Sequence, residues 1–248
     1  MISPLAYVDK EARIGANVTI HPFAYIDKNV EIGDNCTIMP YASILSGTRM
    51  GTDNIIYQGA IIGATPQDFK FKGEDTLLKI GNHNTIREKG ILNRGTNTTD
   101  CTIIGDGNFL LEGVHLAHDT HLGSHCVLGN GAKTAGNCII DDKAILGSEV
   151  IVKHGCRIGS WALLRDGCRA NKDVPPYIVA AHNPISYYGI NALILAKEGH
   201  LTENVIDNIA KCYRQIYQCG TSLENALRRI KDIIPLSPEI TYLVDFIE

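Results

Sequence analysis

Three histidines lie at intervals of three residues in one short stretch of the chain: His115, His118 and His121. Asp119 follows the second of them directly. A histidine beside a carboxylate can act as a general base, because the carboxylate orients the imidazole and stabilises its protonated form. Three histidines in a polar turn can also be simply solvated, so the interpretation depends on the elements that position them.

The same histidines could instead bind zinc, which accepts imidazole nitrogen as a ligand. His115 and His121, however, occupy the same position of a six-residue repeat and should therefore diverge around a corner. We predict a general base and no metal site, with zinc as the alternative.

The six-residue repeat organises most of the chain. Of 29 positions taken every six residues from Ile2 to Ala170, 24 are Ile, Leu, Val or Met. This period predicts a parallel β-helix in which three short faces make one coil and the coils stack about 4.8 Å apart. A small residue four positions after the aliphatic one should fill the core, and the glycine that often follows the aliphatic residue should allow a tight turn.

Two stretches interrupt the repeat and are predicted to be loops, one of about 12 extra residues at 66–79 and one of about 6 at 95–100. Together the extra residues make one full coil, so the faces return in phase after the second loop. Both loops should leave from a single corner of the prism, which also receives Arg94, His118, Gly136 and His154.

Stacking at this corner suggests a chemical arrangement. Gly136 should lie one coil above His118, where its unobstructed backbone N–H can donate to a developing oxyanion. His154 should lie one coil higher again, about 10 Å from His118 by strand spacing. The corner therefore combines a base with an oxyanion donor.

The repeat fails after Ala170, and we expect residues 1–183 to form the β-helix and 184–248 a C-terminal helical domain. Helices are expected near Pro184 to Glu198, from Thr202 to Gly220, from Ser222 to Pro235, and briefly after Ser237. Their apolar stripes should dock on the end or flank of the prism.

Composition excludes several classes of protein. A net charge of −4 does not suggest a nucleic-acid binder. The first residues do not read as a signal peptide, and no apolar run approaches the roughly 18 residues needed for stable membrane insertion. Five of the eight cysteines occupy the small position of the repeat, so we expect buried thiols in a cytoplasmic protein. These five are Cys36, Cys126, Cys138, Cys156 and Cys168.

With these motifs the chain resembles the UDP-N-acetylglucosamine O-acyltransferase family, which catalyses the first step of lipid A biosynthesis. The resemblance covers nearly the whole length. It rests on the coils and on Gln67-Asp68-Phe69-Lys70, Gly73-Glu74, Arg87-Glu88, Arg94-Gly95-Thr96, His115-Leu-Ala-His118-Asp119, Asp173-Val-Pro-Pro-Tyr177 and Gly189-Ile-Asn191.

The resemblance implies a left-handed parallel β-helix that assembles as a homotrimer, with active sites between subunits. It implies transfer of a (3-hydroxy)fatty acyl group from acyl carrier protein to the 3-hydroxyl of UDP-N-acetylglucosamine. The acyl carrier protein thioester is the co-substrate, and no cofactor is expected. By the same resemblance His118 is the base, Asp119 supports it, and Gly136 is the oxyanion donor.

Further residues are assigned by the resemblance to the substrates. In the first loop, Gln67, Asp68 and Lys70 are expected to hold the sugar or the phosphopantetheine arm. The residues expected near the nucleotide sugar are His115, Asn137, His154, Asn191 and Lys197. Arg165 and Asp166 stand on the coil that sets acyl length.

Two alternatives remain to the interpretation that the chain acylates the 3-hydroxyl of UDP-N-acetylglucosamine. The chain could be a paralogue that acylates another nucleotide sugar, such as one with a 3-amino group. It could also be a non-catalytic member that binds a nucleotide sugar, since Asn137 stands where the family usually has a further histidine. The intact His118 and Asp119 favour catalysis.

Overall fold

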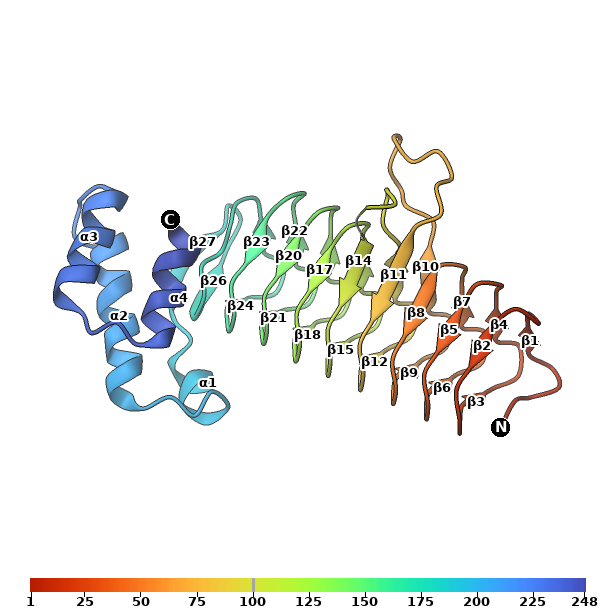
Figure 1. Cartoon of the computed structure of the whole chain (residues 1–248). Coiled ribbons are helices and arrows are strands. Elements are labelled where there is room, and N and C mark those ends of the chain that lie inside the picture. Colours follow the sequence, from red (N-terminus) through yellow and green to blue (C-terminus); the bar gives the residue numbers. More distant parts are fainter. Residues whose placement is uncertain (100) are drawn as a thin grey trace.

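A computed structural model describes residues 1–99 and 101–248 of the chain. Asp100, the last residue of the second predicted loop, lies outside the described residues. Short parallel strands repeat along most of the chain and stack into a prism with three flat faces, followed by four helices at its C-terminal end (Figure 1). The predicted parallel β-helix with a C-terminal helical region is therefore confirmed.

Each face of the prism is one sheet. The nine-stranded sheet contains β1 Tyr7–Val8, β4 Tyr25–Ile26, β7 Ser43–Ile44, β10 Ile61–Ala64, β13 Ile91–Asn93, β16 His115–Leu116, β19 Lys133–Thr134, β22 Ile151–Val152 and β25 Arg169–Ala170. The eight-stranded sheet contains β2 Arg13–Ile14, β5 Glu31–Ile32, β8 Thr48–Met50, β11 Leu77–Ile80, β14 Cys101–Ile104, β17 His121–Leu122, β20 Ile139–Ile140 and β23 Arg157–Ile158. The ten-stranded sheet contains β3 Thr19–Ile20, β6 Thr37–Ile38, β9 Ile55–Ile56, β12 Thr85–Ile86, β15 Phe109–Leu110, β18 Val127–Leu128, β21 Ile145–Leu146, β24 Leu163–Leu164, β26 Ile178–Ala181 and β27 Ser186–Ile190.

The core lies inside the prism and follows the repeat. The aliphatic residues at the six-residue spacing point inward, and Ile26, Ile44 and Leu116 are each fully buried. Burying one such side chain stabilises the fold by about 1.5–3 kcal/mol. The five cysteines at the small position are also buried, as predicted, and all eight cysteines are free thiols.

The glycines that follow the aliphatic residue act differently from the prediction. Apart from Gly63 they do not have positive φ, and the left-handed conformation instead falls two residues later, for example at Asn17 and Asp119. A Cβ on Gly105 would lie 2.7 Å from the carbonyl carbon of Gly123 in the next coil. These glycines are therefore needed because neighbouring coils stack closely, and the turn does not require their conformational freedom.

Both loops leave the prism where the chain passes from the nine-stranded to the eight-stranded sheet, as predicted (Figure 1). We call this edge the His118 corner; it carries Arg94, His118, Gly136 and His154. The first loop is shorter than the predicted 66–79, because Leu77 already pairs with Cys101 and Lys79 with Arg49 in the sheet. The chain therefore rejoins the sheet three residues earlier than the repeat suggested.

The C-terminal region differs from the prediction at its start. We expected a helix from Pro184, but Ser186–Ile190 form strand β27, which pairs antiparallel with β26. The first helix, α1, begins only at Ala192 and ends at Lys197. The other three helices match the predictions: α2 Glu203–Tyr217, α3 Leu223–Ile233 and α4 Pro238–Ile247. Their caps are the expected Thr202, Ser222 and Ser237, each of which accepts a backbone N–H of the first turn.

Tyrosines fasten the helices to the end of the prism. Tyr213 of α2 is fully buried and donates its hydroxyl to the Pro176 carbonyl. The Tyr242 hydroxyl of α4 donates to the Asp141 carboxylate at 2.7 Å and accepts the Ser160 N–H at 3.0 Å.

In the described part of the chain, no helix combines the length and the apolar character that a membrane crossing needs.

Candidate active site

His118 lies in the turn between β16 and β17 and is 8% exposed. Its ring packs against Gly136 of the next coil, where a Cβ would lie only 2.3 Å from the His118 Cε1 and 2.6 Å from Nε2. Gly136 therefore provides the space that the imidazole occupies. The six-residue repeat places the two residues one above the other, as the sequence predicted.

Asp119 is buried beside His118 and accepts hydrogen bonds at both carboxylate oxygens. The Thr96 backbone N–H donates to Oδ1 at 2.9 Å, and the Thr96 hydroxyl donates to Oδ2 at 2.7 Å. Oδ2 also lies 2.8 Å from the His118 Nδ1. Burial alone would raise the pKa of Asp119, but the hydrogen bonds from Thr96 and His118 outweigh burial and hold this pKa below its ordinary value.

This pairing determines how His118 can react. An ionised carboxylate only accepts hydrogen bonds, so the His118 Nδ1 must carry the proton that points at Asp119. In the neutral ring Nε2 is then an acceptor with a free lone pair. Nε2 lies 3.7 Å from an Asp68 carboxylate oxygen, so the first loop brings a second acidic side chain to the reactive side of the ring.

The first loop is held in place from the neighbouring turn. The Asn93 side-chain amide donates to the Thr65 carbonyl at 2.7 Å. The Arg94 guanidinium donates to the Thr76 hydroxyl at 3.1 Å and lies over the Phe71 ring. These contacts fix the base of the loop next to the His118 corner.

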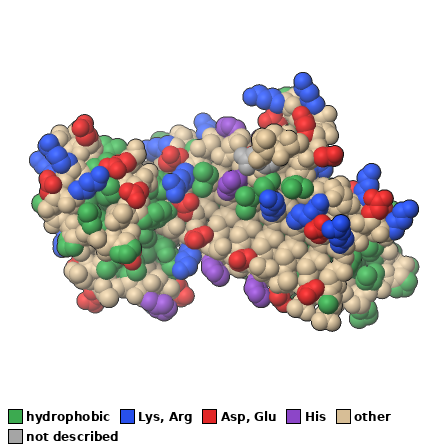
Figure 2. Space-filling view, in the orientation of Figure 1, with side chains coloured by type: hydrophobic (Ala, Val, Ile, Leu, Met, Phe, Trp, Pro, Cys, Tyr) green, Lys and Arg blue, Asp and Glu red, His purple; other side chains and the backbone are tan. Residues whose placement is uncertain are grey.

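The outer part of the loop is exposed, and Gln67 and Lys70 lie there. Figure 2 shows basic side chains at the tip of the loop that projects from the prism. Lys70 also fixes Asp68, because its backbone N–H donates to the Asp68 carboxylate at 2.7 Å. Among the three loop residues predicted to bind substrate, Asp68 is the one that approaches His118.

The coils above His118 supply a donor and two exposed side chains. Within the described residues, the Gly136 backbone N–H donates to no acceptor. Asn137 is exposed, and its backbone N–H donates to the His118 carbonyl at 3.0 Å. His154 is exposed one coil higher. The predicted oxyanion donor therefore stands next to the predicted base.

The other two histidines of the stretch separate as expected. His115 is in the nine-stranded sheet and His121 in the eight-stranded sheet. Burial lowers the pKa of His115, and the charges of Lys133 and His118 lower it further. In residues 1–99 and 101–248 no three His, Cys, Asp or Glu side chains are grouped so that they could hold a metal ion.

Four predicted site residues lie away from this corner within one chain. Arg165 and Asp166 follow β24 of the ten-stranded sheet; the Arg165 guanidinium lies 4.2 Å from the Tyr188 ring centroid, and Asp166 accepts the Ser148 N–H at 2.8 Å. Asn191 is buried and donates its side-chain amide to the Trp161 carbonyl. Lys197 is exposed at the end of α1.

Three threonines that were not predicted to be site residues stabilise the turn that contains His118. The Thr102 hydroxyl accepts the Asp119 backbone N–H at 2.8 Å, and the Thr134 hydroxyl accepts that of Ala117 at 3.2 Å. The sequence could have indicated Thr134, because it is a polar residue at a position of the repeat that is usually aliphatic. Thr96 lies in a loop outside the repeat, where periodicity provides no information.

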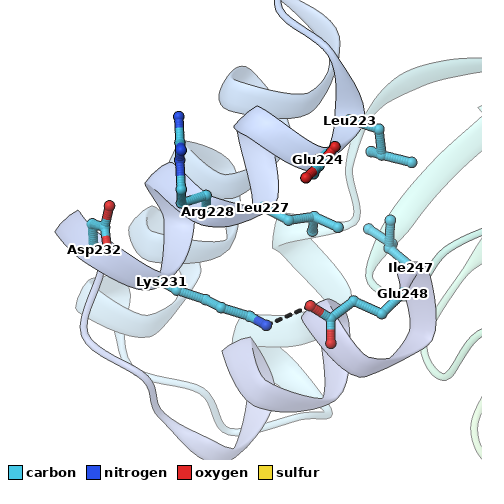
Figure 3. A pocket seen from close by; sticks show the side chains of 8 residues that line it. All are labelled: Leu223, Glu224, Leu227, Arg228, Lys231, Asp232, Ile247 and Glu248. Atoms are coloured by element: carbon cyan, nitrogen blue, oxygen red, sulfur yellow. Dashed lines mark hydrogen bonds and ion pairs between the residues drawn. The ribbon is translucent and has the colours of Figure 1, made fainter.

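The C-terminal helices contain a separate surface hollow of about 520 Å³ between α3 and the end of α4 (Figure 3). Leu223, Leu227 and Ile247 line it, and an ion pair between Lys231 and Glu248 crosses it. No predicted site residue lies there. The residues predicted to act in catalysis are therefore separate from this hollow.

Comparison with known proteins agrees with this geometry. The model of the bacterial transferase hexapeptide, six repeats, matches residues 11–40, 29–64 and 101–136. Stacked coils of this kind with a buried histidine–aspartate pair define a hexapeptide-repeat transferase. A second model, described as UDP N-acetylglucosamine O-acyltransferase, domain 2, matches residues 173–248.

Two full-length relatives are named acyl-[acyl-carrier-protein]–UDP-N-acetylglucosamine O-acyltransferase. The relative from Thermodesulfovibrio yellowstonii is 38% identical, with 100% of this chain and 94% of the relative covered. The relative from Halorhodospira halophila is 44% identical, with 100% and 96% covered. A crystal structure of a UDP-N-acetylglucosamine acyltransferase from Bacteroides fragilis is 50% identical, with a TM-score of 0.96 over 99% of this chain and 96% of that one. The chain belongs to the UDP-N-acetylglucosamine O-acyltransferase family.

Proposed function

We propose that this protein transfers a 3-hydroxyacyl group from acyl carrier protein to the 3-hydroxyl of UDP-N-acetylglucosamine, the first step of lipid A biosynthesis. The proposal rests on the His118–Asp119 pair beside the Gly136 N–H, which has no acceptor among the described residues, and on full-length relatives that are named for this activity. Acyl carrier protein and the nucleotide sugar are then the two substrates.

The His118 Nε2 accepts the proton of the sugar 3-hydroxyl as its oxygen attacks the thioester carbonyl carbon. Asp119 holds the ring through Nδ1 and stabilises the imidazolium that forms. No covalent bond to the enzyme is needed, because the hydroxyl oxygen itself forms the new ester bond.

The attack converts the thioester carbonyl into a negatively charged oxygen, and the Gly136 N–H can donate to it. The intermediate collapses by breaking the carbon–sulfur bond. The phosphopantetheine thiol leaves and takes a proton from the His118 imidazolium, which restores the neutral base. The 3.7 Å distance between the Asp68 carboxylate and Nε2 supports a role for Asp68 in holding the sugar or the phosphopantetheine arm.

The test compares two histidines of the same stretch in an assay with acyl carrier protein thioesters. General-base catalysis contributes about 10²–10⁴-fold, so His118→Ala should lower kcat by at least that factor with little change in KM. His121→Ala is the matched control and should change little. Equal losses in both variants, or activity that follows added zinc, would contradict the assignment of His118.

Acceptor identity is tested in the same assay by comparing UDP-N-acetylglucosamine with its 3-amino analogue. The proposed enzyme should prefer the 3-hydroxyl substrate. Turnover of the amine alone would indicate the paralogue, and binding of the nucleotide sugar without turnover of either would indicate the non-catalytic member.

We further propose a homotrimer with sites shared between subunits. Two observations support it. Phe69 in the first loop is fully exposed, and four predicted site residues are separated from the His118 corner within one chain: Arg165, Asp166, Asn191 and Lys197. A neighbouring subunit can both cover Phe69 and bring such residues to the corner. Light scattering should give three times the 27.0 kDa of one chain, and a stable, fully active monomer would contradict the shared site.

The eight free cysteines favour a reducing compartment, so we propose that the enzyme works in the cytoplasm.

A further inference from the structure

The second loop contacts the His118 corner through Thr96. This threonine donates twice to the Asp119 carboxylate, from its backbone N–H to Oδ1 at 2.9 Å and from its hydroxyl to Oδ2 at 2.7 Å. Two donors on two oxygens fix both the position and the plane of a carboxylate, which a single hydrogen bond does not. The hydroxyl bond ends on the same oxygen that faces the His118 Nδ1.

The Asp119 carboxylate is held by Thr96 of the second loop, because the turn that contains Asp119 supplies few other hydrogen-bond donors to it. Asp119 adopts a left-handed conformation with φ of 57°, and its backbone N–H is taken by the Thr102 hydroxyl. Its side chain is 3% exposed, so water supplies little hydrogen bonding to the carboxylate. Among the described residues, Thr96 and His118 are the only side chains that donate to it.

We propose that Thr96, which the second loop brings to the His118 corner, is a positioning residue for the His118–Asp119 pair. The proposal rests on the proposed function, since it assumes that His118 is the base. Thr96 acts through Asp119 and need not touch either substrate.

The test replaces Thr96 by Val, which keeps the shape and the backbone donor but removes the hydroxyl. We expect Thr96→Val to lower kcat about 10-fold, equal to about 1.4 kcal/mol in the barrier, with KM for both substrates unchanged. Thr96→Ser retains the hydroxyl and should restore at least half of the activity. Thr99→Val is the matched control, because the Thr99 hydroxyl donates only within the loop, to Asn97 at 2.8 Å, and it should have wild-type kinetics.

A double-mutant cycle separates positioning from a general effect on the loop. In an Asp119→Asn background Thr96→Val should cost less than about 2-fold, because the hydroxyl acts through that carboxylate. Losses that multiply in the double variant, or equal losses in Thr96→Val and Thr99→Val, would overturn the proposal. So would wild-type kcat in Thr96→Val.

The outcome of His118→Ala distinguishes this proposal from the proposed function. If His118→Ala is inactive while Thr96→Val is not impaired, only the role of Thr96 fails. If His118→Ala is fully active, the base assignment fails and the role of Thr96 fails with it.

Discussion

A methyl group added at Gly136 should disable the enzyme without unfolding it. The Cβ of Gly136→Ala would lie 2.3 Å from the His118 Cε1, whereas ordinary contacts of this kind begin at 3.4 Å. The backbone of two stacked coils cannot separate easily, so the imidazole must move by about 1 Å. A displacement of about 1 Å at a reacting group can cost about 10²-fold in rate.

We therefore expect Gly136→Ala to lower kcat by about 10²-fold, with little change in KM or in melting temperature. The ring can move because it ends a flexible side chain, and this movement breaks its 2.8 Å contact with Asp119. Steady-state kinetics and thermal unfolding measure the two effects separately.

Gly155→Ala is the contrasting variant from the same corner, one coil above. Gly155 has φ of 72°, and a Cβ there meets nothing within 4 Å. Its substitution should therefore lower the melting temperature through backbone strain of about 1–2 kcal/mol and leave kcat unchanged. Full activity in Gly136→Ala, or a loss explained by unfolding alone, would refute the placement of the base against this glycine.

Three further predictions follow from the structure. If Asp166 closes the acyl slot, Asp166→Gly should shift donor preference toward longer acyl chains, because burying the Asp166 carboxylate against methylenes is costly. Unchanged selectivity across a panel of acyl carrier protein thioesters would place Asp166 outside the slot. Because the pKa of Asp119 lies below its ordinary 3.8, its carboxylate stabilises the fold above that value, and this stabilisation is lost as the pH falls through the lower folded-state pKa. The difference in melting temperature between wild type and Asp119→Asn should accordingly shrink on acidification below about pH 4, and a constant difference would contradict it. Seven of the eight thiols are buried, and burial raises the pKa of Cys126 to about 12. A thiol reagent should therefore label only the exposed Cys219 in the native protein and all eight cysteines in denaturant.

The repeat made much of this structure predictable from the sequence. An aliphatic residue every six positions specifies both which side chains point inward and which turns lie above one another, so the stacking of Gly136 on His118 followed from counting. The helical caps were equally local signals, since Thr202, Ser222 and Ser237 act on the first turn that each precedes.

Features outside the repeat were not predictable in this way. The strand Ser186–Ile190 exists because it pairs antiparallel with β26, a contact that no six-residue period encodes. Thr96 reaches Asp119 from a loop whose path depends on tertiary contacts. Arg165 and Asp166 could be placed on a coil by counting, but they follow a strand of another sheet, and no period of the sequence indicates what they contact.

The strict register of the prism also limits how such a chain can change in length during evolution. Outside the two loops, residues paired in neighbouring coils are 18 apart, so a deletion of six residues between His118 and Gly136 would turn every later coil by one face. Gly136 would then leave the corner of the base, and the site would be lost even if the core remained apolar. The two loops differ because both of their ends return to the sheets, so a change in loop length does not shift the coils that follow. New substrate contacts can therefore arise in the loops, whereas the coils can gain or lose only whole turns.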